Sequence, residues 1–467
     1  MSRVALLFLA LVVLAPTSAP AEAPTTLRLD YFHTASADEE RFALDAVVLE
    51  GPWPGNPARP LDDLNLGKYR FEVIDRATNR TVYSRGFASI CGEWETTGEA
   101  RRVHRTFHES LRFPEPGGPA QVVLKKRGPD GLFREVWSVA VDPADPTIDR
   151  SGPPPADNVW AVLDSGPPSS KVDLLLMGDG YTAEEMEKWH RDARRMADLL
   201  FATPPFEERR GDFNVWAIDT PSRQSGVARP SDGVHRRSAL RVTYDAFGSE
   251  RYVLAFDNRR LREFAAAAPY DVLVLVVNGR KYGGGGIFNL YATVASDNAF
   301  TPYVMVHEFA HHFAGLADEY YTSDVAYEST FARPEPWELN ATASTTSPKW
   351  LDLVTPGAPL PTPWEKEAFE ETQREIQARR REIRAEGRPE EEMEALFHEE
   401  QERVDALLAR GDHAEAVGAF EGAMYEARGY YRPQANCMMF TRTTKFCAVC
   451  RHALERVIDL YTRPAPE

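Results

Sequence analysis

The sequence predicts two successive folded regions, an all-β sandwich and then an α/β domain that carries an inserted helical hairpin. Residues 26–142 contain short β-rich runs between turn residues, which is the pattern of a sandwich. After residue 158, continuous apolar strands alternate with helical patterns, as they do in α/β domains. Residues 363–412 are rich in Glu, Arg, Lys, Ala and Leu, with apolar side chains at helical spacing.

The domain boundaries follow from these changes in composition. Residues 22–142 form the predicted sandwich, and residues 143–158, with their Asp-Pro and Gly-Pro-Pro-Pro steps, form a predicted linker. Residues 159–467 form the predicted α/β domain, and 363–412 are its helical insertion with a turn at residues 387–389. Strands of the sandwich are expected at residues 27–31, 69–74, 121–125 and 136–139.

The first 21 residues have the organisation of a secretory signal peptide. A positive start at Arg3 precedes an apolar run from Val4 to Ala15 and a segment of small residues that ends near Ala21. The apolar run is too short to span a bilayer, and no later stretch is long and apolar enough. We therefore expect a secreted or periplasmic protein without a membrane anchor.

The net charge of the chain bears on which binding partners we expect. A net charge of −17 argues against nucleic acid or an anionic membrane surface. Nothing in the composition indicates an oligomeric state.

Several segments of the α/β domain have recognisable local structure. Thr182 and Glu185 have the spacing of a capping box at a helix start. The glycine run 283–286 lacks the Lys-Ser/Thr of a phosphate-binding loop, and we expect a flexible turn there. The turn would lead into a strand at 288–294, which as a sheet edge could pair with an extended peptide. Three further apolar segments are predicted strands, at residues 172–177, 215–218 and 270–277.

The strongest chemical signal is a predicted helix that ends at Gly315. It contains the pattern His307-Glu308-x-x-His311, which places both imidazoles one turn apart on one face. This spacing suits two ligands of a tetrahedral zinc ion, with Glu308 beside the first ligand as general base toward water. We expect His312 to point elsewhere and not to bind the metal.

A catalytic zinc ion needs a third protein ligand and an open position. In the metzincin peptidases a glycine and a third histidine follow the helix pattern. Here the glycine falls one residue later, and Asp318 stands three residues beyond it, as in the G-x-x-D pattern of the snapalysins that this segment resembles. Asp318 is the preferred third ligand, followed by Glu319 and then by a more distant glutamate.

The metzincin analogy also predicts a methionine turn beneath the metal. Met438 or Met439 lies in the expected place, C-terminal to the helix. Just upstream, Tyr431, or its neighbour Tyr430, could donate a hydrogen bond to the oxyanion of a tetrahedral intermediate. We expect Tyr431 to be a catalytic residue.

The four cysteines allow more than one interpretation. Cys447 and Cys450 form a C-x-x-C pair that fits a redox or a metal site, but no second such pair completes a zinc knuckle. An exported chain permits disulfides, so a structural disulfide that uses Cys437 is favoured. The pairing among these three and Cys91 stays open.

Taken together, these blocks resemble the M64 family of metallopeptidases, whose founding activity is the cleavage of immunoglobulin A. The resemblance covers nearly the whole mature chain. It is carried by residues 83–90, 92–97, 177–182, 212–214, the glycine run, the helix of His307, and residues 421–425, 431–433 and 447–451. It implies a zinc-dependent endopeptidase with His307 and His311 as ligands and Glu308 as base, and it does not imply an immunoglobulin substrate.

Three functions compete on this sequence. The first is a secreted zinc-dependent endopeptidase with Zn²⁺ held by His307, His311 and Asp318, acting on a protein or peptide. The second is a zinc amidase that acts on cell-wall peptides or glycopeptides with the same metal and base. The third is a non-catalytic binding protein, against which the intact Glu308 argues.

Overall fold

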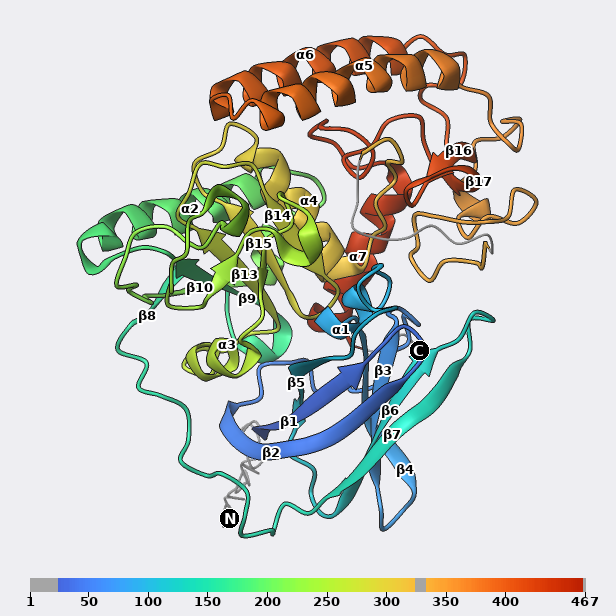
Figure 1. Cartoon of the computed structure of the whole chain (residues 1–467). Coiled ribbons are helices and arrows are strands. Elements are labelled where there is room, and N and C mark those ends of the chain that lie inside the picture. Colours follow the sequence, from blue (N-terminus) through green and yellow to red (C-terminus); the bar gives the residue numbers. More distant parts are fainter. Residues whose placement is uncertain (1–23, 324–332, 465–467) are drawn as a thin grey trace, which may run out of the picture.

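The computed structural model describes residues 24–323 and 333–464. The expected signal peptide, residues 1–21, lies outside this part of the chain. Figure 1 shows the N-terminal sheets at the bottom, a mixed sheet with its helices above them, and a pair of long helices at the top. None of the helices within 24–323 and 333–464 is long and apolar enough to cross a membrane.

The N-terminal part consists of two antiparallel sheets that enclose one core. The three-stranded sheet has the order β2-β1-β5, and the four-stranded sheet has the order β4-β3-β6-β7. Their strands are β1 (Thr25–Ala35), β2 (Glu40–Pro52), β3 (Tyr69–Asp75), β4 (Arg80–Phe87), β5 (Arg105–Pro114), β6 (Ala120–Arg127) and β7 (Phe133–Val141). Every second residue of β1, β3 and β6 is buried in this core, as the two-residue period of a strand requires. All four strands predicted here therefore form.

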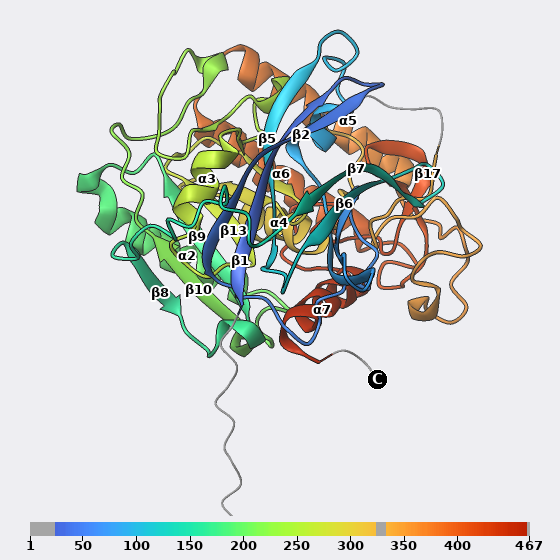
Figure 2. The same cartoon turned by 90° about the horizontal axis from the view of Figure 1, so that it is seen from below.

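A polar contact joins the three-stranded sheet to the rest of the chain. Arg112 of β5 bonds to Glu50 of β2, and its guanidinium also donates to the carbonyl of Tyr270 at 3.0 Å. The amide of Asn258, the first residue of α3 (Asn258–Ala265), donates to Ser110 of β5 at 2.8 Å. Figure 2 shows β1 and β5 running alongside α3. The N-terminal sheets are thus fixed against the second part of the chain.

The second part is built on a six-stranded mixed sheet with the order β14-β15-β13-β9-β10-β8. The inner strands run parallel, and the two outermost strands are antiparallel to their neighbours. The strands are β8 (Val159–Leu163), β9 (Val172–Asp179), β10 (Phe213–Ile218), β13 (Val272–Val277), β14 (Gly284–Ile287) and β15 (Tyr291–Ala295). β9 and β13 are buried along their whole length, which explains their unbroken apolar sequences.

Three helices accompany the sheet: α2 (Met186–Phe201), α4 (Thr301–Ala314) and α7 (Ala448–Thr462). The predicted capping box forms, because Thr182 and Glu185 exchange bonds just before α2. α4 lies along β14 and β15 and also contacts α2 and α7. α4 therefore packs against the edge of the sheet that contains the glycine run.

The glycine run is itself an edge strand, which corrects the expectation of a turn leading into a strand at 288–294. Gly284–Ile287 pair with Tyr291–Ala295, and residues 288–290 make the turn between the two strands. The absence of side chains permits close packing. A Cβ atom on Gly286 would lie 2.3 Å from the carbonyl oxygen of Glu308, and one on Gly284 would lie 2.7 Å from Val304. Only glycine allows α4 to lie this close to the strand.

Two long helices, α5 (Lys366–Ala385) and α6 (Glu390–Leu408), pack against each other within residues 363–412. They also contact the start of α4. The ring of Phe397 lies 5.5 Å from that of Phe300, and Glu394 accepts from the main chain of Ala299 at 3.0 Å. These contacts anchor a pair of helices that is otherwise rich in surface ion pairs.

The remaining elements are short. A β-hairpin, β16 (Phe420–Ala423) and β17 (Glu426–Arg432), follows the long helices. The others are α1 (Ile90–Trp94), β11 (Val242–Thr243), β12 (Leu254–Ala255) and the 3₁₀ turns Pro168–Ser170, Ala183–Glu185, Arg210–Asp212, Pro230–Asp232, Ala246–Gly248 and Leu351–Leu353.

Candidate metal centre and active-site cleft

The histidine pair lies on α4, which ends as its sequence predicts. Gly315 adopts a left-handed backbone (φ 59°), and its N–H donates to the carbonyl of His311 at 3.0 Å. This reversal brings the following segment back along the helix. As a result, Asp318 lies against the face that carries His307 and His311.

The three side chains meet at their donor atoms. His307 Nε2 and His311 Nε2 are 3.1 Å apart, and each is 3.1 Å from Asp318 Oδ1. A tetrahedral ion with ligand distances of about 2.0 Å requires donors about 3.3 Å apart. The observed triangle therefore fits one face of such a site. Two imidazoles and one carboxylate are also a donor set that zinc accepts.

The far side of each imidazole is held by a main-chain carbonyl. His307 Nδ1 donates to the carbonyl of Met438 at 3.1 Å, with the hydroxyl of Tyr303 at the same distance. His311 Nδ1 donates to the carbonyl of Leu316 at 2.5 Å. A carbonyl only accepts, so both protons are placed on Nδ1 and both Nε2 lone pairs face the triangle. This is the arrangement that orients metal-binding histidines.

The second oxygen of Asp318 is held by a tyrosine. Tyr425 donates from its hydroxyl to Asp318 Oδ2 at 2.5 Å. Burial opposes ionisation of the Asp318 carboxyl, but positive charge on the imidazoles of His311 and His307 outweighs burial and holds the pKa of Asp318 well below its usual range. With the neutral imidazoles described above, a bound cation would take over this effect. Tyr425 and the preceding Met424 both have positive φ angles, 64° and 51°. Such strained backbone is common at functional sites, and here it directs the tyrosine to Asp318.

Glu308 lies beside the triangle and is partly exposed to the cleft. Burial raises the pKa of its carboxyl, although the nearby His307 and His311 act in the opposite direction. A carboxylate with a raised pKa is a better proton acceptor. The residue therefore has the position and the basicity that a general base needs.

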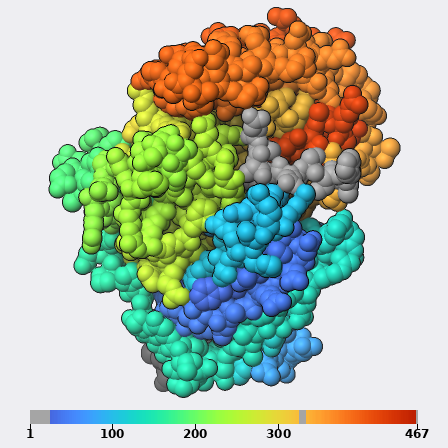
Figure 3. All heavy atoms as spheres, in the orientation of Figure 1, coloured from blue at the N-terminus to red at the C-terminus, as the bar shows by residue number. Residues whose placement is uncertain are grey.

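These residues open into a cleft of about 730 Å³. One wall is formed by β14 and by Arg251 and Tyr252, and another by the segment that carries Asp318. The N-terminal part supplies a further wall, through residues 126–129 and through Gly92, Glu93, Glu95 and Thr96 of α1 and its following turn. Figure 3 shows the N-terminal part, in blue, in contact with the later parts of the chain. The two regions share the cleft, so both shape what can enter it.

Several tyrosines line the cleft, but Tyr431 is not among its lining residues. Successive side chains of a strand point to opposite sides, so Tyr430 of β17 faces the cleft and Tyr431 faces away. Tyr320 also lines the cleft, and its hydroxyl accepts from Arg251 at 3.2 Å. Sequence reasoning missed Tyr425 and Tyr320, for which the only signal was their nearness to motif blocks.

His312 is bonded entirely to main chain. Its Nδ1 donates to the carbonyl of Ile287 at 3.1 Å, and its Nε2 accepts from the N–H of Leu273 at 3.1 Å. Burial lowers the pKa of this imidazole to about 3. A neutral His312 thus ties α4 to the sheet and leaves the triangle to the other two histidines.

The cysteines do not form the expected disulfide. All four are free, and Cys437 Sγ and Cys450 Sγ are 3.7 Å apart, whereas a disulfide bond measures about 2.05 Å. Glu319, the second candidate for the third metal ligand, points toward these thiols and not toward the histidines. The two neighbouring acids Asp318 and Glu319 therefore belong to different sites.

Comparison with known proteins identifies the family to which the chain belongs. Residues 160–458 match the family described as IgA Peptidase M64, and residues 21–138 match the one described as Peptidase M64 N-terminus. No curated protein matches the chain. The two matches cover nearly the whole chain and confirm the resemblance seen in its motifs. The chain belongs to the IgA Peptidase M64 family, and it is therefore a metallopeptidase that hydrolyses peptide bonds.

Proposed function

We propose that the protein is a secreted, zinc-dependent endopeptidase with a metzincin-like catalytic domain. His307, His311 and Asp318 hold the zinc ion, and Glu308 is the general base. The observation that carries this proposal is the triangle of three donor atoms, each 3.1 Å from the others, beside a partly exposed glutamate. Zinc bound there would acidify water and polarise a peptide carbonyl.

The chain's own residues would divide the remaining work. Glu308 takes a proton from the attacking water and delivers it to the leaving amine, a role favoured by its raised pKa. For the oxyanion we propose Tyr320 in place of Tyr431, because Tyr320 lines the cleft and Arg251 donates to its hydroxyl. A hydroxyl that accepts from a guanidinium becomes a stronger donor.

Edge strand β14 is the proposed binding surface for the substrate backbone. Residues 284–286 line the cleft beside Glu308 and His311. Tyr252 bridges to Gly284, and beyond that point β14 pairs only with β15 within the described part of the chain. An extended peptide would add to this edge by main-chain hydrogen bonds. This arrangement favours a polypeptide substrate.

The domain assignment is part of the same proposal. Residues 1–21 would be removed on export, 22–142 would form a sandwich domain, and 143–158 would connect it to a catalytic domain at 159–467. The helices within 363–412 would be an insertion into that domain. Their contacts with the start of α4 suit a role in supporting the catalytic helix.

The experiment compares the protein comprising residues 23–467 with its Glu308→Gln variant. We expect zinc in both and cleavage of casein or mixed proteins in the parent, reduced by about 10²- to 10⁴-fold in the variant. Glu263→Gln, an exposed position on α3, is the matched control and should leave cleavage unchanged. Removal of zinc by a chelator should abolish cleavage, and added zinc should restore it.

Two outcomes would contradict the proposal. Undiminished proteolysis by Glu308→Gln would show that Glu308 is not the general base. A parent protein that binds no metal at the triangle would show that the triangle is not a zinc site. If the parent released peptides from cell-wall fragments and cleaved no protein, the amidase would replace the endopeptidase.

A further inference from the structure

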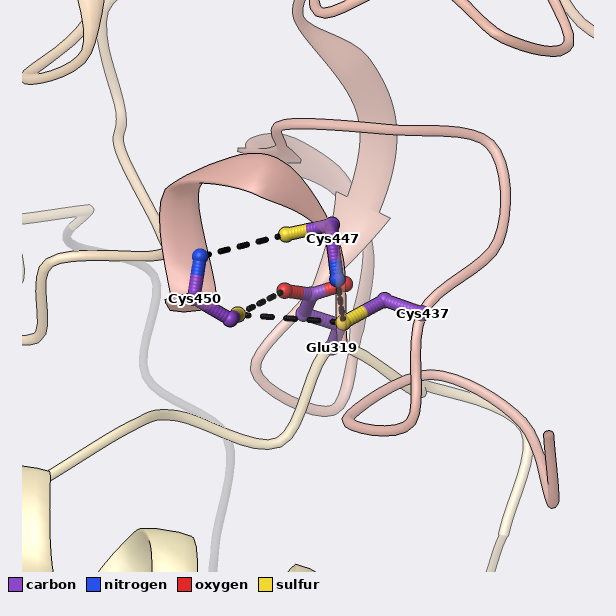
Figure 4. Close-up of side chains that lie close together, drawn as sticks. All are labelled: Glu319, Cys437, Cys447 and Cys450. Atoms are coloured by element: carbon purple, nitrogen blue, oxygen red, sulfur yellow. Dashed lines mark hydrogen bonds between the residues drawn. The ribbon is translucent and has the colours of Figure 1, made fainter. Parts of the chain in front are cut away.

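A second group of metal-binding side chains lies outside the triangle. Glu319, Cys437, Cys447 and Cys450 are all buried, and one donor atom from each lies within 4.8 Å of the others. Figure 4 shows the four side chains pointing toward one another from three separate segments. Glu319 and Cys450 are 131 residues apart in the sequence. The cluster is thus made by the fold and not by one local motif.

The separations match a tetrahedral thiolate site. Zinc–sulfur bonds of about 2.3 Å place two sulfur ligands about 3.8 Å apart, and a sulfur and an oxygen ligand about 3.6 Å apart. Cys437 Sγ and Cys450 Sγ are 3.7 Å apart, and Cys450 Sγ lies 3.4 Å from Glu319 Oε1. These thiols are therefore spaced as ligands of one ion and are too far apart for a bond.

The carboxylate of Glu319 supplies an independent reason for a cation. The side chain is fully buried, and its Oε2 has no hydrogen-bond partner among the described residues. Its Oε1 accepts from Asn340 at 2.9 Å. The guanidinium of Arg432 acts on Glu319 through its charge, but it donates its hydrogen bonds to main-chain carbonyl oxygens and not to Glu319. A buried carboxylate left in this way is costly unless a charge pairs with it.

Main-chain N–H groups point at two of the three sulfurs. Cys447 caps the N-terminus of α7, where the helix dipole stabilises negative charge. The N–H of Cys450 points to Cys447 Sγ at 3.4 Å, and the N–H of Cys447 points to Cys437 Sγ at 3.3 Å. Donors of this kind orient sulfur ligands and stabilise their charge.

We propose that Glu319, Cys437, Cys447 and Cys450 bind a structural zinc ion that is separate from the ion held by the triangle. Four buried protein ligands leave no open position, which is the mark of a structural site. Three thiolates select zinc over magnesium, calcium or manganese. A disulfide would use only two of the three sulfurs, and it would leave both a lone thiol and the unpaired carboxylate.

The proposed structural zinc ion would help to hold the residues of the triangle in place. Glu319 follows Asp318 directly, and its N–H donates to the carbonyl of Met439 at 2.8 Å. Cys437 precedes Met438, whose carbonyl accepts from His307. An ion that joins Glu319 to Cys437 would therefore hold together the two segments that position a ligand and a supporting carbonyl of the triangle.

The test uses a variant that disables only the triangle. The parent protein should contain about two zinc ions per chain, and His311→Ala should retain about one. X-ray absorption at the zinc edge of His311→Ala should then show mainly sulfur neighbours, and its cobalt-substituted form should show thiolate-to-metal charge-transfer bands. Because this variant has no peptidase activity to lose, failure of the proposed function would not affect the result.

Variants within the cluster complete the test. Glu319→Gln keeps the shape of the side chain and should lower retention of the second ion by about 10- to 100-fold in a chelator competition. Cys91→Ser removes the one cysteine outside the cluster and should leave both ions in place. Both proteins are compared at equal helical content, so that misfolding is not mistaken for loss of a ligand.

Two results would overturn the proposal. In the first, the unreduced parent protein has a mass lower by two hydrogens than the fully reduced chain, and fewer than four of its thiols react after denaturation. The cluster would then hold a disulfide. The other is a His311→Ala protein with four reactive thiols and no sulfur-bound metal, because the thiols would then be only packed.

Discussion

Replacement of Gly286 by alanine probes the contact between edge strand β14 and α4, the helix that carries His307 and His311. The new Cβ would lie 2.3 Å from the carbonyl oxygen of Glu308 and 2.8 Å from Cβ of His311. The first of these atoms belongs to the backbone of α4 and cannot rotate away. The strand and the helix must therefore separate.

The size of the effect follows from these distances. Ordinary contact requires about 3.4 Å, so β14 and α4 must move apart by about 1 Å. Overpacking of this kind costs about 1–3 kcal/mol, which in a chain of this size lowers the unfolding temperature by about 1–3 °C. A displacement of about 1 Å between catalytic groups and bound substrate can reduce turnover about 10²-fold. We expect activity to fall far more than stability.

The assay measures kcat/KM on a protein substrate, zinc content and thermal unfolding of Gly286→Ala. Gly211→Ala is the matched control, because a Cβ there meets nothing within 4 Å. Gly286→Ala should retain zinc, unfold a few degrees lower and lose most of its activity, whereas Gly211→Ala should resemble the parent. A Gly286→Ala protein with parental activity and unfolding temperature would refute the view that this glycine sets the spacing of strand and helix.

Three further predictions concern the triangle and its supports. Tyr425→Phe removes the hydrogen bond to Asp318 and should weaken zinc binding by about 10- to 100-fold in a chelator competition; unchanged affinity would show that this bond does not orient the ligand. His312→Ala should lower the free energy of unfolding by about 1–3 kcal/mol in a denaturant titration, because it leaves buried main-chain groups unpaired, while zinc content stays parental. The raised pKa of Glu308 means that the base is protonated, and inactive, at pH values where an ordinary glutamate is ionised. The acid limb of kcat/KM against pH should therefore lie above 4.5 and should disappear in what activity Glu308→Gln retains.

Local sequence patterns predicted much of the fold. The apolar strands, the capping box of Thr182 and Glu185, and the helix that ends at Gly315 all appear where expected. Each of these depends on the conformational preferences of neighbouring residues, which a single sequence records directly. The glycine run was the exception, because a strand without side chains has no apolar pattern and is recognisable only by the helix that packs on it.

The candidate site also has features that the sequence predicts and features that only the structure shows. The spacing of His307 and His311 is a property of one helix, so their positions in the sequence are enough to predict that the two imidazoles share a face. The sequence also proposed Asp318 ahead of Glu319 as third ligand. The chain reversal after Gly315 brings Asp318 to the two histidines, whereas Glu319 points to the cysteines. Alternation along β17 likewise places Tyr430, and not Tyr431, in the cleft.

The sequence did not predict contacts between residues that are far apart along the chain. Tyr425 reaches Asp318 across 107 residues, and His307 reaches the carbonyl of Met438 across 131. The cluster of Glu319 with three cysteines and the cleft wall built from the N-terminal sheets arise in the same way. The sequence predicted the helix with its pair of histidines and the family of the chain. Which distant groups complete each candidate site is visible only in the folded chain, because the packing of the whole core brings those groups together and no local spacing does.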